Sequence, residues 1–84
     1  MAIESNTIYD TPQGKLRLIV VHETLVQVTA GAYKSYLYIE DVQEKGMIIS
    51  IQDLLDRCIA LKIPSLVTAT EHVLKAVTHV MINE

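Results

Sequence analysis

Apolar residues recur over residues 50–82 at the three- and four-residue spacing of amphipathic helices. The pattern predicts two helices joined at residues 62–65, because Pro64 ends the first helix and is accepted at the start of the next. Ser50 and Asp53 are expected to cap the first helix. The apolar stripes are Ile51, Leu54, Leu55, Cys58 and Ile59 in the first helix, and Leu66, Ala69, Val73, Leu74, Val77, Val80 and Met81 in the second. The apolar stripes of such a hairpin must be shielded from water, either by the preceding half of the chain or by a second copy of the chain.

The first half of the chain alternates with the two-residue period of β-strands. Strands are predicted at residues 15–22, 25–30 and 34–40, with a short last strand at residues 47–50 after a polar connection at residues 41–46. Pro12 and Gly14 predict a turn before the first of these strands. Residues 2–9 are expected to form an edge strand or an arm. Residues 15–22 are apolar on both faces, which is typical of a central strand.

These elements predict an α+β domain, with an antiparallel sheet of about four strands followed by two C-terminal amphipathic helices packed on one face. Residues 1–84 are expected to form a single small domain that is strand-rich over 1–50 and a helical hairpin over 51–82. A helix over residues 16–28 is the rival interpretation. The seven β-branched residues from Ile19 to Thr29 favour strands instead.

The expected core is aliphatic, since the chain has ten Ile, nine Val and nine Leu but no Phe and no Trp. A chain of this size buries roughly 60–65% of its unfolded surface, so its stability is modest. Association with a further copy would add buried area. We therefore expect a homo-oligomer, a dimer or larger.

Charge and composition narrow the range of partners. The formal net charge is −3, and the seven basic residues are scattered from Lys15 to Lys75, which argues against a nucleic-acid partner. Residues 65–71 at the start of the second helix contain no Arg, Asn or Gln, which argues against a DNA-reading helix-turn-helix. The lone Cys58 suits a reducing compartment, and neither a basic leader nor a long apolar run is present. These features predict a cytoplasmic protein with no membrane partner.

No residues have the spacing of a catalytic or metal site. His72 and His79 are separated by about 10.5 Å along a helix, which is too far for one ion. His22 and Glu23 are adjacent at a strand end, but no nucleophile accompanies them. Cys58 lies on the apolar stripe of the first helix and is expected to pack there. We therefore predict that the chain is not an enzyme and has no catalytic residues, cofactor or metal.

Three of the four tyrosines lie within six residues, at Tyr33, Tyr36 and Tyr38, with Lys34 among them. On a strand, Tyr36 and Tyr38 share a face. Tyrosine is enriched at protein interfaces because it brings a large contact area at little entropic cost. Tyr33, Lys34, Tyr36 and Tyr38 are therefore the predicted partner-binding residues. The same rings could instead stack on bases, or simply pack under the helices.

The predicted function is that of a small, self-associating protein-interaction module, such as a regulator, an inhibitor or an assembly subunit. The alternative is a module that binds a small ligand or nucleotide. It would use the tyrosine-bearing sheet face or a pocket between protomers.

Overall fold

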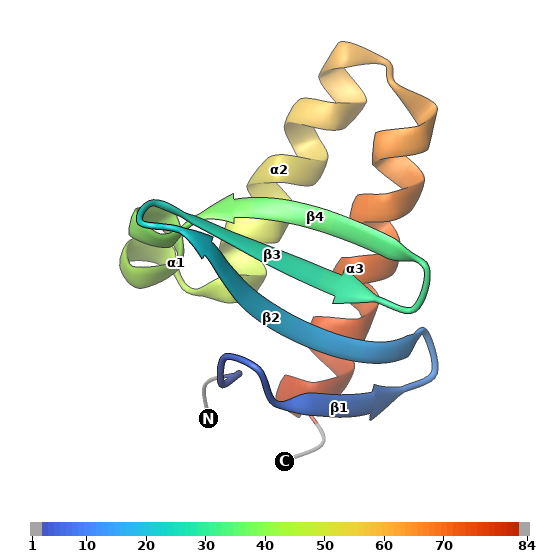
Figure 1. The fold of residues 1–84 in the computed structure, drawn as a ribbon. Coiled ribbons are helices and arrows are strands. Elements are labelled where there is room, and N and C mark those ends of the chain that lie inside the picture. Colours follow the sequence, from blue (N-terminus) through green and yellow to red (C-terminus); the bar gives the residue numbers. More distant parts are fainter. Residues whose placement is uncertain (1–2, 83–84) are drawn as a thin grey trace.

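Four antiparallel strands form one sheet, and their order across the sheet is their order along the chain. The helices lie behind this sheet (Figure 1). The computed structural model describes residues 3–82. The strands are β1 (Ile8–Thr11), β2 (Gly14–His22), β3 (Leu25–Ala30) and β4 (Tyr33–Tyr38). The helices are α1 (Ile39–Lys45), α2 (Met47–Leu61) and α3 (Pro64–Ile82). The α+β prediction is confirmed, since the sheet comes first and the last two helices close the described part of the chain.

Two glycines allow the turns at one end of the sheet to lie side by side. Gly31 occupies the first central position of the β3–β4 turn with a φ of +59°, the sign that a type II′ turn requires there. Gly14 opens β2 with a φ of +104°. A Cβ atom on Gly14 would lie 2.6 Å from the Cα atom of Gly31. The close approach of the two turns therefore depends on the missing side chains.

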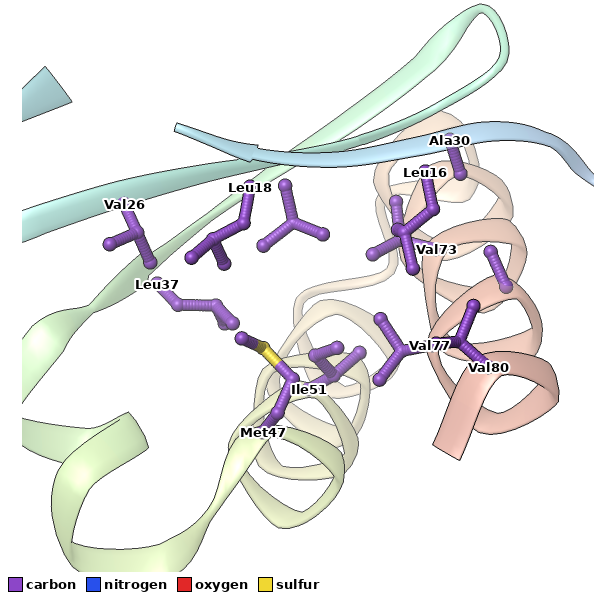
Figure 2. Packing of buried hydrophobic residues seen from close by; sticks show 12 residues of the cluster. Leu16, Leu18, Val26, Ala30, Leu37, Met47, Ile51, Val73, Val77 and Val80 are labelled. Carbon is purple, nitrogen blue, oxygen red and sulfur yellow. The ribbon is translucent and has the colours of Figure 1, made fainter. Parts of the chain in front are cut away.

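One face of the sheet packs on the helices and forms the core (Figure 2). The largest fully buried side chains are Leu16, Ile51, Val28, Val73 and Val77. The remaining members of the core cluster are Leu18, Val26, Ala30, Leu37, Met47, Ala76 and Val80. α3 contacts all four strands, whereas α2 packs mainly on α3 and touches the sheet at β4. The layer between sheet and helices is thus filled by aliphatic side chains and one methionine.

The helical region begins earlier than the sequence pattern predicted. Residues 41–46 were expected to be a loop and residues 47–50 a strand, but α1 and α2 cover both segments except for Gly46. Met47 and Ile51 are both buried and lie one helical turn apart, so the apolar stripe of α2 extends toward its N-terminus. The fourth strand of the sheet is β1 instead.

The predicted cap of the first long helix is also wrong. Ser50 lies inside α2, and its hydroxyl donates a hydrogen bond of 2.7 Å to the carbonyl oxygen of Gly46. Gly46 itself stands at the N-cap position, with φ 86° and ψ 164°. This backbone region is nearly restricted to glycine, so Gly46 is the joint between α1 and α2.

The N-terminal stretch is partly an arm and partly a strand. β1 begins only at Ile8, while Ser5 makes an isolated parallel bridge to Leu18 of β2. Ala2, which the predicted edge strand included, lies outside the described residues. At the other end of the sheet, β4 stops at Tyr38 and the Ile39 amide donates to the carbonyl of Thr24.

An ion pair connects α1 to α2. Lys45 Nζ lies 3.0 Å from Asp53 Oδ2, and the hydrogen bond and charge of Asp53 raise the pKa of Lys45 above its ordinary value of 10.5. Both groups are accessible to water, so the pair adds little to stability. Because the folded pKa is the higher one, this small contribution is present at neutral pH and is lost as pH rises through the folded pKa.

A titration of the Lys45 side chain by NMR tests this pair. The folded protein should give a Lys45 pKa above 10.5, and Asp53→Asn should return it toward that value because the carboxylate charge is gone. An unshifted pKa in the unmodified protein would contradict the pairing.

Candidate interaction surface

The sheet has one face on which no helix of residues 3–82 packs, because α1, α2 and α3 lie on the other side (Figure 1). We call it the outer face. Strand register and alternation place these side chains on it: Ile8, Asp10, Lys15, Arg17, Ile19, Leu25, Gln27, Thr29, Lys34, Tyr36 and Tyr38. An antiparallel sheet with one wet face normally presents polar residues to water there. The aliphatic and tyrosine side chains of this outer face depart from that pattern.

Register gathers positive charge at one end of the outer face. Arg17 pairs with Thr29, and Thr29 pairs with Lys34 on the next strand. Lys15 lies two residues before Arg17 on β2 and forms an ion pair with Asp10. We define the cationic end by Lys15, Arg17 and Lys34. By contrast, α1, α2 and α3 together carry six acidic residues but only two lysines and one arginine. Positive charge therefore gathers on the sheet and negative charge on the helices.

The opposite end of the outer face is aromatic and aliphatic. Gln27 pairs with both Ile19 and Tyr36, forming a central row across three strands, and Leu25 pairs with Tyr38 beyond it. Tyr36 is 47% exposed and Tyr38 is 58% exposed. We define the tyrosine end by Leu25, Tyr36 and Tyr38.

Acidic groups border the tyrosine end. A hollow of about 430 Å³ lies beside Tyr38, between the β2–β3 turn and α1. Glu23 of the turn and Glu40 of α1 both line it. The two ends of the outer face therefore differ in electrostatic character as well as in apolar content.

Of the four predicted partner-binding residues, the structure brings three together. Lys34, Tyr36 and Tyr38 share the outer face. Side chains alternate between the two faces along β4, so Tyr33 lies on the helix side of the strand. Its ring centroid is 4.6 Å from that of His72. His72 Nε2 donates a hydrogen bond of 2.8 Å to the carbonyl of Gln13. Tyr33 thus belongs to a contact between α3 and the strand turns.

The sequence pattern did not nominate Arg17, Ile19 or Leu25 as site residues. They are far from the tyrosines along the chain, and only the pairing of β2 with β3 and of β3 with β4 brings them beside Tyr36 and Tyr38. The signal in the sequence is the apolar outer side of residues 15–22, a pattern that by itself predicts burial on both faces. β2 is indeed flanked by β1 and β3, but its outer side chains have no covering layer among the described residues.

The histidine, cysteine and acidic side chains of the described region are dispersed over the fold. Within residues 3–82 no three His, Cys, Asp or Glu side chains gather closely enough to hold a metal ion. Cys58 is buried, with Sγ 3.9 Å from Thr70 Oγ1. His22 Nδ1 lies 3.2 Å from Thr24 Oγ1 in the exposed β2–β3 turn. None of the helices described here has the length and hydropathy needed to cross a bilayer.

No protein-family model, curated protein or solved structure matches this chain.

Proposed function

We propose that this chain is a non-enzymatic protein-interaction module that self-associates through the outer face of its sheet. One observation carries the proposal: Tyr36 and Tyr38 are exposed beside Ile19 and Leu25 on a face without a helical cover in the described region. Contiguous apolar surface of this kind marks interaction sites. Tyrosine is a frequent anchor of such sites because it loses few rotamers on burial.

The modest core supports the same proposal. Thirteen hydrophobic residues are buried among those described, and none of them is aromatic. Small domains of this kind gain stability when a second copy buries further surface. Covering the outer face would remove its aliphatic and tyrosine side chains from water, which is favourable at about 25 cal/mol per Å² of apolar area.

The two ends of the outer face are complementary under a two-fold rotation. Consider two sheets packed face to face, with the axis between them and parallel to the Ile19–Gln27–Tyr36 row. This rotation places the cationic end of one copy over the tyrosine end of the other, as an isologous dimer requires. Lys34 would lie over Tyr38 of the partner subunit, a cation–π arrangement. Arg17 would approach Glu23 of the partner subunit, which adds opposite charges at the rim.

Replacing both exposed tyrosines tests the proposal. The double variant Tyr36→Ala and Tyr38→Ala should raise the dissociation constant of the dimer by at least about 30-fold, since interface tyrosines typically contribute about 1–2 kcal/mol each. Light scattering over a dilution series gives the mass at each concentration. Urea unfolding at one concentration checks that the fold persists, because both side chains lie outside the core.

Tyr33→Ala is the matched control, since it makes the same chemical change on the other face of the same strand. It should leave self-association within about twofold of the unmodified chain, because Tyr33 makes no contact on the outer face. Equal losses in both variants would show that the outer face is not the interface. A monomer at every concentration would refute self-association itself.

A second candidate is favoured by one observation, the cationic end beside exposed tyrosine rings. Tyrosines stack on bases, while Arg17 and Lys34 would contact phosphates. Thermal-shift measurements with an oligothymidylate and with free nucleotides separate the candidates, because a ligand bound only by the folded state raises Tm. A rise that disappears at high salt would support the nucleotide-binding candidate. No rise would exclude it.

A further inference from the structure

We propose that the free edge of β4 binds an extended peptide segment of a partner protein as a fifth strand of the sheet. This site uses the backbone edge of β4 and a cavity beneath α2 and α3, so it differs from the outer face although Lys34 and Tyr36 border both. It therefore goes beyond self-association and can be tested separately from it.

The first support is the unpaired backbone of β4. β4 is the last strand of the sheet, and within the described chain no strand pairs with its far edge. The Ile39 amide donates to Thr24 at 2.9 Å, so odd-numbered residues of this segment point their backbone groups toward β3. By the alternation of antiparallel pairing, the N–H and C=O groups of Lys34, Tyr36 and Tyr38 point outward. An added strand can pair with these groups.

The second support is an apolar cavity beside this edge. The α2–α3 hairpin extends beyond β4 (Figure 1), so it covers the place where a fifth strand would lie. Beneath it lies a cavity of about 340 Å³. Residues from three elements line the cavity: Lys34, Ser35 and Tyr36 of β4, Leu54 and Cys58 of α2, and Leu66 and Thr70 of α3. The volume lies at the lower end of the range for ligand pockets.

Ser35 explains why the cavity is open at the edge strand. On the same face of β4, Leu37 is a long side chain that belongs to the core cluster, whereas Ser35 is short. Val28 of β3, which pairs with Ser35, is already fully buried. Nothing in β4 itself therefore fills the space between Ser35 and the overhanging Leu66.

This geometry defines the chemistry of the occupant. Side chains of the added strand alternate between the two faces. The residue opposite Ser35 would enter the cavity and should be a branched aliphatic one, since Leu54 and Leu66 line it. The residue opposite Lys34 would lie on the outer face, where an acidic side chain gives a favourable cross-strand pair. The residue opposite Tyr36 should be β-branched or aromatic for the same reason.

A second copy of the chain does not fit this edge. Pairing two β4 strands about a two-fold axis perpendicular to the sheet would place both helical layers on the same side. Each α2–α3 hairpin extends past its own β4 (Figure 1), so the two hairpins would compete for one layer above the joined strands. A bare extended segment brings no helices, and it is the occupant that the overhang accepts.

Selection from a displayed library of random twelve-residue peptides tests the proposal with the full chain as bait. Selected peptides should alternate, with an aliphatic residue between an acidic residue and a β-branched or aromatic one. Leu66→Asp should weaken their binding at least tenfold, because it places a charge in the cavity wall. An acid in the first turn of α3 is compatible with the helix dipole, so this variant should fold. Leu61→Asp is the matched control, since Leu61 is 67% exposed and does not line the cavity.

Backbone N-methylation distinguishes strand addition from other modes of binding. Methyl groups on the amides that face β4 should weaken a selected peptide at least tenfold, while methyl groups on alternate amides should not. Tyr38→Ala should keep peptide binding even where dimerisation is weakened, because the β4 backbone remains and Tyr38 does not line the cavity. The proposal is overturned if no peptide is enriched, if Leu66→Asp and Leu61→Asp weaken binding equally, or if N-methylation has no positional effect. It is also overturned if Leu66→Asp abolishes dimerisation, because the edge would then be a contact between copies.

Discussion

Ile51→Ala should lower the free energy of unfolding by about 2–5 kcal/mol, the range measured for truncating a buried aliphatic residue to alanine. Ile51 is fully buried, and Figure 2 shows it between Met47 of the same helix and Val77 of α3. Truncation would remove three carbon atoms from a close-packed layer and leave a cavity that the rigid sheet cannot close. Because small domains have only about 5–15 kcal/mol of stability in total, a large fraction would be lost.

Urea unfolding followed by circular dichroism measures this change. Ile59→Ala is the matched control, since it makes the same truncation in the same helix where the side chain is 52% exposed. It should cost less than about 1 kcal/mol. Similar losses for the two variants would mean that α2 does not present Ile51 to the sheet as described.

Gly14→Ala should destabilise the protein by at least about 2 kcal/mol, for two independent reasons. The first is the φ of +104°, which is strained for any residue with a Cβ atom. The second is steric, because the added Cβ would lie 2.6 Å from Gly31 Cα and 2.9 Å from Gly31 N. Both are backbone atoms, so relief would require the β3–β4 turn to move away from β2.

Gly46→Ala separates these two contributions. Gly46 also has a positive φ, of +86°, but a Cβ atom there would meet nothing within 4 Å. Its substitution should carry the conformational cost alone. The difference between the two variants in thermal or urea unfolding then measures the steric cost of the crowded turns. A Gly14→Ala variant no less stable than Gly46→Ala would show that the turns are not in contact in solution.

Local patterns predicted the helical hairpin and the three longest strands well. The apolar stripe of residues 51–61 and the break at Pro64 depend on neighbours within one or two turns, so they are readable from sequence. The same reasoning failed at residues 41–50. Short apolar runs such as the one beginning at Met47 are compatible with either a strand or a buried helix. Burial of Met47 beneath the sheet, a long-range contact, decided in favour of the helix.

The candidate site, too, was predictable from the sequence only in part. Alternation alone predicted that Tyr36 and Tyr38 share a face. It gave no means of choosing whether that face meets the helices. The packing of α3 against Val28 and Leu37 made the choice, and it also turned Tyr33 toward His72.

The sequence by itself determined the class of the fold, the aliphatic character of its core and the grouping of side chains along each element. These properties follow from the periods of helix and strand, which are local. Tertiary structure alone decided which face of the sheet stays uncovered, which cations join the tyrosines there, and how far the helical hairpin extends past β4. The physical reason is that strand register and layer packing join residues distant in the chain, and no local period encodes those contacts.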